Sequence, residues 1–164
     1  MSTTYKRLIN EYLKLNDFTY NNKLFSLIKN IKYKIFIIDH DKLLYKTIIE
    51  FTYYNVPFNV NIMYNKYYPF EPPDKIVINN RNINDIYKNI MKLNIDLLNN
   101  ECLCCKSYLC VNNWYIKYNI NDILNEIVKV INYKKLHVQR RLLNSIINKY
   151  CPNENMDYIH YYLL

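Results

Sequence analysis

Apolar positions near the start of the chain recur at i, i+3, i+4 and i+7, the spacing of one face of an α-helix. The residues on this face are Tyr5, Leu8, Ile9, Tyr12 and Leu13. Thr3 and Thr4 precede the pattern as candidate N-cap residues. The basic residues Lys6, Arg7 and Lys14 remain available to solvent. The pattern therefore predicts an amphipathic opening helix.

The spacing then changes to that of β-strands. Three runs have strand character, Ile31–Ile38, Tyr45–Tyr53 and Phe58–Tyr64, and in the third run apolar residues alternate with polar ones. Short connections between the runs favour an antiparallel meander. The loop Tyr68-Pro69-Phe70-Glu71-Pro72-Pro73 disfavours helix because its prolines lack backbone donors, and Lys75–Ile78 after it predicts a short fourth strand.

The rest of the chain returns to helical spacing. An apolar series predicts a helical insertion over Ile83–Leu98, and a second series predicts a helix over Ile120–Ile131. A further helical stretch covers Leu136–Tyr150 and stops near Pro152. Met156–Leu164 predicts one more short helix.

These elements predict one α+β domain, because 164 residues suit a single domain and no repeat or linker interrupts them. We expect a core over residues 1–133 and a helical extension over residues 134–164. No uncharged apolar run reaches the roughly 18 residues that span a bilayer, and the N-terminus lacks a signal-like region. The sequence therefore predicts a soluble, cytoplasmic protein without a membrane partner.

Composition narrows the possible functions. The chain contains no glycine, which excludes the glycine-rich loops that bind nucleotide phosphates, and we expect no cofactor. Turns with positive φ must then use residues such as Asn. The net charge of +8 is spread along the whole sequence, so nucleic acid is not the expected partner.

Four of the five cysteines lie between Glu101 and Trp114. The cluster consists of Cys102, Cys104, Cys105 and Cys110. A chain of this size without a secretory signal has reduced thiols or a metal site more often than a disulfide scaffold. A thiolate is nucleophilic near neutral pH and is also a good leaving group. The stretch from Glu101 to Trp114 is therefore the candidate site.

The order of these features resembles that of the ubiquitin-conjugating enzymes. In that family a helix and a strand meander are followed by a Tyr-Pro-Phe-x-Pro-Pro loop, as at Tyr68 to Pro73 here. Trp114 and the helix that starts near Ile120 are similar to the family's tryptophan and the helix packed behind its active cysteine. The resemblance covers roughly the first 130 residues. It implies a fold with an N-terminal helix, a four-stranded antiparallel meander and C-terminal helices.

The resemblance also implies an activity. Members of the family carry ubiquitin or a ubiquitin-like protein as a cysteine thioester and pass it to a lysine. The segment from Cys105 to Leu109 looks most like the family's active-site continuation, and Cys105 lies nine residues before Trp114. Cys105 is therefore the candidate catalytic residue, with Cys102 and Cys104 as alternates.

Partners follow from the same resemblance. Lys6, Arg7 and Lys14 match the family's basic first helix, on which the activating enzyme docks, and Phe70 matches a ligase contact. Large nucleocytoplasmic viruses have divergent proteins of this type with cysteine-rich active regions, which would place this chain in the host cytoplasm.

Two departures from the family concern the site and the ligase surface. The His-Pro-Asn tripeptide that normally precedes the cysteine is missing, and Asn84, Asn99 or Asn100 could supply its amide only by another route. The family's Ser-Pro-Ala after the tryptophan is replaced by Tyr115-Ile116-Lys117, which puts conventional ligase recognition in doubt.

Other interpretations of the cluster stay open. The chain could be a catalytically inactive binding module with the ubiquitin-conjugating or related RWD-type fold, since a fold alone does not establish activity. The cysteines could be small apolar core residues beside Trp114. They could also bind zinc through Cys102, Cys104, Cys105 and Cys110, although this spacing is crowded.

Overall fold

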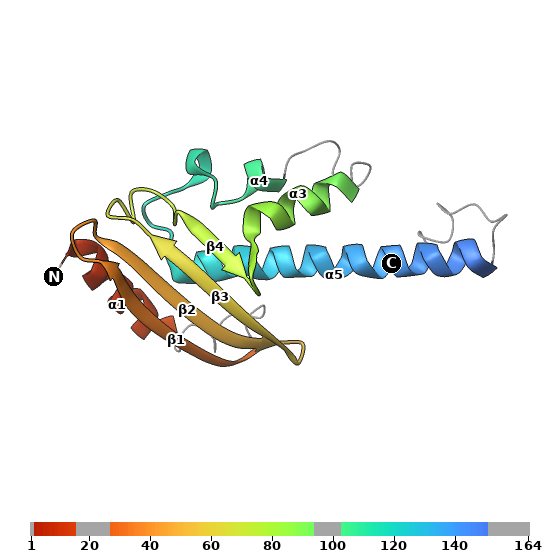
Figure 1. The fold of residues 1–164 in the computed structure, drawn as a ribbon, viewed down its shortest axis with the longest axis horizontal. Coiled ribbons are helices and arrows are strands. Elements are labelled where there is room, and N and C mark those ends of the chain that lie inside the picture. The colour runs from red at the N-terminus through yellow and green to blue at the C-terminus, as the bar shows by residue number, and fades with distance from the viewer. Residues whose placement is uncertain (1, 16–26, 94–102, 151–164) are drawn as a thin grey trace.

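The computed structural model describes residues 2–15, 27–93 and 103–150; for residues 91–93, 103 and 104 it describes the backbone alone. The fold is α+β, with an N-terminal helix, an antiparallel sheet and C-terminal helices (Figure 1). In chain order the elements are α1 (Thr3–Leu13), β1 (Ile28–Asp39), β2 (Leu44–Tyr53), β3 (Val56–Tyr64), β4 (Lys75–Ile78), β5 (Arg81–Asn82), α3 (Ile83–Leu93), α4 (Leu103–Lys106), the 3₁₀ turn η3 (Val111–Asn113) and α5 (Ile120–Tyr150).

The opening helix is confirmed, but its N-cap is Ser2 and not Thr3 or Thr4. Ser2 has extended backbone angles, and its hydroxyl accepts a hydrogen bond from the backbone N–H of Tyr5 at 3.2 Å. Thr3 and Thr4 already lie in the first helical turn. Thr4 is buried, and its hydroxyl donates to the carbonyl of Tyr68 at 3.0 Å. This hydrogen bond connects α1 to the loop Tyr68–Pro73, which we call the proline-rich loop.

The sheet is an antiparallel meander in the order β1-β2-β3-β4-β5. The four predicted strands are present, and the two-residue strand β5 makes a fifth that was not predicted. Asn79 and Asn80 connect β4 to β5 with φ of 45° and 65°, and Tyr54 and Asn55 connect β2 to β3 in the same way. Asn thus supplies left-handed turns in this glycine-free chain, as predicted, although Tyr54 shares the task.

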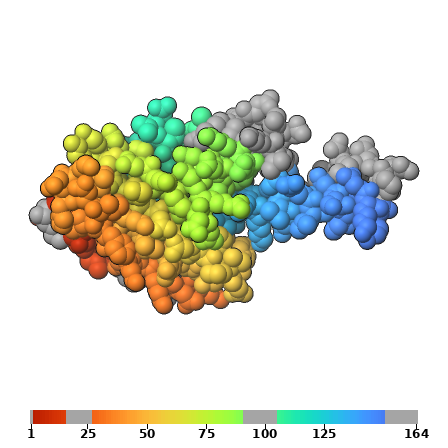
Figure 2. All heavy atoms as spheres, in the orientation of Figure 1, coloured from red at the N-terminus to blue at the C-terminus, as the bar shows by residue number. Residues whose placement is uncertain are grey.

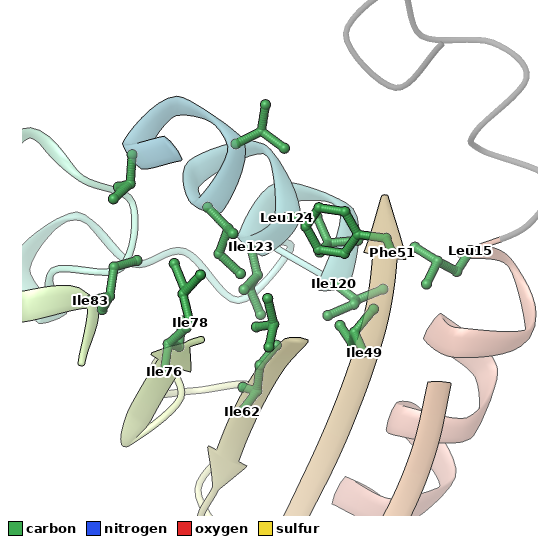
Figure 3. Close-up of a cluster of buried hydrophobic side chains, with 14 of the residues drawn as sticks. Leu15, Ile49, Phe51, Ile62, Ile76, Ile78, Ile83, Ile120, Ile123 and Leu124 are labelled. Carbon is green, nitrogen blue, oxygen red and sulfur yellow. The ribbon is translucent and has the colours of Figure 1, made fainter. Parts of the chain in front are cut away.

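One face of the sheet is buried against α1 and α5. On β2 and β3 buried residues alternate with more exposed ones, because successive strand residues point to opposite faces. Figure 3 shows Ile120, Ile123 and Leu124 of α5 beside apolar side chains of the strands. The strand residues labelled there are Ile49, Phe51, Ile62, Ile76 and Ile78. The first turns of α5 therefore fill the centre of the core.

The helical predictions are confirmed in part. The insertion begins at Ile83 as expected, while its last residues lie outside the described part of the chain. The predicted stretches Ile120–Ile131 and Leu136–Tyr150 form one continuous helix, α5, because no Pro or Gly separates them. The predicted helix at Met156–Leu164 also lies outside the described residues. No helix within the described ranges has both the length and the apolar character needed to cross a membrane.

Candidate functional site

The candidate nucleophile lies on a short helix beside α3. Cys105 occupies the last turn of α4, and its side chain is exposed. Figure 1 shows α4 next to α3, on the side of the molecule away from α1. Cys110 is half-buried in the turn that precedes η3, where its backbone N–H donates to the carbonyl of Ser107 at 3.1 Å. The two described cysteine side chains thus differ in access to solvent.

A buried polar network anchors the turn that follows Cys105. Ser107 is almost completely buried, and its hydroxyl donates to the carboxylate of Glu126 on α5 at 2.9 Å. It accepts hydrogen bonds from the hydroxyl of Tyr87 on α3 at 3.2 Å and from the backbone N–H of Leu109 at 3.1 Å. Burial raises the pKa of Tyr87 to about 12, so its hydroxyl remains a donor at neutral pH. We call residues 105–114 the cysteine segment. Ser107 therefore joins the cysteine segment to both α3 and α5.

Asn113 fixes the backbone on either side of this anchor. Its side-chain amide donates to the carbonyl of Cys105 and to the carbonyl of Ser107, the latter at 3.1 Å. The end of α4 and the following turn are thereby held by one amide group. Because both of these bonds come from one amide group, Asn113 supports the position of Cys105 relative to the turn at Ser107.

Trp114 connects the cysteine segment to the proline-rich loop. Its indole N–H donates to the carbonyl of Pro69 at 2.8 Å, and its ring lies 6.1 Å from that of Tyr68, centroid to centroid. On the other side it meets the ring of Tyr118 edge-on at 5.6 Å. The two motifs on which the family resemblance depends are thus in direct contact.

We expect Trp114→Phe to lower the free energy of unfolding by about 1–2 kcal/mol, because it removes this hydrogen bond and part of a half-buried ring. Urea denaturation measures the change. Tyr115→Phe is the matched control, since the ring of Tyr115 is exposed, and it should change stability by less than about 0.5 kcal/mol. Equal effects of the two substitutions would contradict a structural role for the indole N–H.

Glu11 of α1 connects three parts of the fold: α1, the proline-rich loop and the start of α5. Its carboxylate accepts hydrogen bonds from the Tyr68 hydroxyl at 2.7 Å and from the backbone N–H of Ile120 at 3.1 Å, and it pairs with Arg7. Arg7 also donates to the carbonyls of Ile116 and Tyr118 at 2.8 and 3.0 Å. The carboxylate therefore caps α5 and holds the loop and the segment before α5 against α1.

Burial raises the pKa of Glu11 above its usual value, although its hydrogen bonds to Tyr68 and Arg7 act in the opposite direction. A carboxyl group whose pKa is raised on folding contributes most to stability below its unfolded-state pKa, and this contribution is lost as the pH rises through the folded-state value. We therefore expect the stability advantage of wild type over Glu11→Gln to narrow as the pH rises above about 4.5, the ordinary pKa of a glutamate side chain. Urea denaturation of both proteins from pH 4 to pH 7 measures the difference in their free energies of unfolding. A difference that widens as the pH rises would contradict this prediction.

A hollow of about 310 Å³ lies where the proline-rich loop, the start of α3 and the cysteine segment meet. Its lining includes Glu71 and Asp74 from the loop, Asn84 from α3, and Leu109 and Val111 from the cysteine segment. Asn84 is one of the candidates for the missing amide, whereas Asn99 and Asn100 lie outside the described residues. Two carboxylates from the proline-rich loop therefore lie beside the cysteine segment, although they are far from it in the sequence.

The predicted partner-binding residues divide into two groups. Lys6, Lys14 and Phe70 are exposed, and the exposed fraction of Phe70 is 75%. Arg7 instead uses its guanidinium within the molecule, as described above. A second hollow, of about 470 Å³, is lined by Lys14, Lys117 and neighbouring residues of α1 and the start of α5.

The zinc interpretation of the cluster stays a prediction. Within residues 2–15, 27–93 and 103–150, no group of three or more His, Cys, Asp or Glu side chains is arranged to hold a metal ion. Cys102 and the side chain of Cys104 lie outside this description. The roles of Cys102 and Cys104 as alternates to Cys105 therefore also stay predictions.

Sequence reasoning missed Glu11, Asn113 and Glu126, because each acts on residues that are distant along the chain or in a loop. One signal was available for Glu11: Arg7 precedes it by four residues, which places the two side chains on one helix face. No comparable pattern connects Ser107 to Glu126.

Comparisons with known proteins leave the family open: no protein-family model, curated protein or solved structure matches the chain.

Proposed function

We propose that the chain is a divergent ubiquitin-conjugating-type transferase that carries ubiquitin or a ubiquitin-like protein on Cys105 and passes it to a lysine, in the cytoplasm. One observation supports this proposal above the others. Cys105 is exposed on a four-residue helix, and the turn after it is anchored by buried polar groups of α3 and α5. An exposed cysteine on a firmly held backbone suits a group that must accept and release a large cargo.

The proposed reaction has two steps. In the first, the Cys105 thiolate attacks the carbonyl carbon of the thioester between the modifier and the activating enzyme. A new C–S bond forms, and the activating enzyme leaves as a thiolate. In the second step a neutral lysine amine attacks the new thioester, an amide bond forms, the amine loses a proton, and Cys105 is released as a thiolate. ATP is consumed only by the activating enzyme.

The segment that follows Cys105 lines a hollow that suits the second step. The hollow beside Leu109 has the carboxylates of Glu71 and Asp74 in its wall, together with Lys75, and the carboxylates can attract the ammonium group of an approaching lysine, which loses a proton before it attacks. Both carboxylates also accept hydrogen bonds from the Asn65 amide, which fixes their positions in the loop. The oxyanion donor that the family takes from His-Pro-Asn remains unassigned among the described residues.

Two surfaces can receive partners. Lys6 and Lys14 are exposed on α1, and Lys14 shares its hollow with Lys117, so an acidic surface of an activating enzyme finds several cations there. Phe70 protrudes from the proline-rich loop, and Tyr115 and Ile116 are also exposed. These apolar side chains are where we propose that a ligase makes contact.

A charging assay tests the proposal. The protein is incubated with ATP, ubiquitin and a ubiquitin-activating enzyme, and in parallel with activating enzymes for other ubiquitin-like modifiers. We expect an adduct with one modifier that disappears on addition of dithiothreitol. If no activating enzyme in the panel yields such an adduct, the proposal fails and an inactive binding module is favoured.

A further inference from the structure

The second half of α5 exposes a row of apolar side chains. Val138, Leu142, Ile146 and Tyr150 follow one another at intervals of four residues and are 46%, 60%, 55% and 69% exposed. Rows of i and i+4 side chains form the ridges used in the commonest class of helix packing. Figure 2 shows this part of α5, in blue, extending away from the body of the protein. We call this row the α5 stripe.

An apolar groove continues the stripe towards the body of the protein. It measures about 680 Å³ and lies between α5, the start of α3, the start of β3 and the end of β4. Its apolar lining consists of Val56, Phe58, Ile78, Ile86, Val130, Ile131 and Val138. Val138 belongs to both features, so the groove and the stripe form one surface. By the rise of an α-helix, this surface runs roughly 28 Å along α5 from Ile131 to Tyr150.

The charge around this surface has one sign. Arg81, Lys134 and Lys135 stand at the groove, and the Lys135 ammonium also lies 4.0 Å from the ring centroid of Tyr54. From Ile127 to Tyr150 the sequence contains six basic residues and no acidic one. They are Lys134, Lys135, Arg140, Arg141 and Lys149, together with Lys129, whose ammonium is paired with Glu126 and lies over the ring of Tyr108. An occupant of the surface therefore meets apolar side chains flanked by positive charge.

We propose that the groove and the α5 stripe bind an amphipathic helix of a partner protein whose polar face is acidic. Such a helix places its apolar residues on the stripe and in the groove, and its carboxylates meet the cations alongside. A second copy of α5 would instead bring two basic helices together, which is unfavourable. A flat bilayer surface cannot fill a concave groove. The proposal does not depend on Cys105 or on the transfer reaction.

Fluorescence anisotropy with a labelled 20-residue peptide tests the proposal on the full-length protein. The peptide carries leucine at i, i+3, i+4 and i+7 and glutamate on its remaining face; a control peptide of the same composition has the order scrambled so that the leucines no longer share a face. We expect the amphipathic peptide to bind at least ten times more tightly at physiological salt. Equal affinity would overturn the proposal, because it would show attraction to charge alone.

Two pairs of variants locate the binding surface. Leu142→Ser with Ile146→Ser should weaken the amphipathic peptide at least tenfold, while Leu13→Ser with Ile38→Ser, which removes two exposed aliphatic side chains elsewhere, should change affinity less than twofold. Thermal melting followed by circular dichroism checks that each variant folds. If the two pairs weaken binding equally, the α5 stripe is not the site.

Charge is tested in the same way. Lys134→Gln with Lys135→Gln should weaken binding at least fivefold, and Lys29→Gln with Lys34→Gln, an equal loss of charge on exposed residues of β1, should change it less than twofold.

Two further measurements test the other occupants. Binding to vesicles with phosphatidylserine tests a membrane, and sedimentation over a range of concentrations tests a second copy of the chain. Stripe-dependent binding to vesicles without peptide discrimination, or a dimer that Leu142→Ser abolishes, would overturn the proposal. Cys105→Ser should bind the peptide as wild type does.

Discussion

Cys105→Ser is expected to reduce the thiol-labile adduct of the proposed charging reaction by at least about 10³-fold, because the substitution removes the proposed nucleophile. A serine hydroxyl is hardly ionised at neutral pH, so any adduct that it forms would be an oxyester that resists dithiothreitol. Cys105 is exposed, and its backbone carbonyl accepts a hydrogen bond from the Asn113 amide, which the substitution does not alter. The variant should therefore fold as wild type does.

The other cysteines provide the controls for this result. Cys110 is half-buried in the following turn, and Cys110→Ser should charge normally if it retains the fold. Single substitutions of Cys102 and Cys104 test the two alternates. If Cys105→Ser charges and Cys102→Ser does not, the assignment moves to Cys102. A metal analysis of the same preparations tests the zinc interpretation, and a stoichiometric zinc ion lost in the single variants would support that interpretation over catalysis.

The strands were predictable from the sequence because each carries a local signal. In Phe58–Tyr64 the apolar residues alternate; Val60, Ile62 and Tyr64 are buried in the core, and Phe58 is partly buried against it. The fifth strand was not predictable, since Arg81–Asn82 has neither length nor apolar character and exists because the Asn79-Asn80 turn returns it to β4. Local patterns thus indicate the sheet, and turn geometry completes it.

The candidate site was predictable only as a segment. Sequence patterns placed Cys105 near Trp114, but the side chains that anchor the turn after it come from other elements: Tyr87 and Glu126, which bind Ser107, lie 20 and 19 residues from it. Such contacts leave no periodic signal, because they are set by how α3 and α5 cross the cysteine segment. The N-cap error at α1 has a related cause. Ser2, Thr3 and Thr4 are all of a residue type that can cap a helix, and the burial of Thr4 against the proline-rich loop decides among them.

Glu11→Ala is expected to lower the free energy of unfolding by about 3 kcal/mol, which corresponds to a fall of roughly 6–12 °C in Tm for a chain of this size. The substitution leaves three donors without their acceptor: the hydroxyl of Tyr68, the backbone N–H of Ile120 and the Nε–H of Arg7. Burial raises the pKa of Tyr68, so its hydroxyl stays protonated and requires an acceptor. Arg7 moderates the loss, because it is partly exposed and keeps its two carbonyl partners.

A matched carboxylate separates this junction from a general effect of charge. Glu50 lies exposed on β2 and makes one long hydrogen bond, at 3.4 Å to the Asn59 amide, so Glu50→Ala should cost less than about 0.5 kcal/mol. Tyr68→Phe removes a single donor and should cost about 1 kcal/mol. Because Glu11 and Tyr68 are in contact, the double variant should lose less than the sum of the two. A Glu11→Ala protein as stable as Glu50→Ala would show that α1, the proline-rich loop and α5 are held together by apolar packing alone.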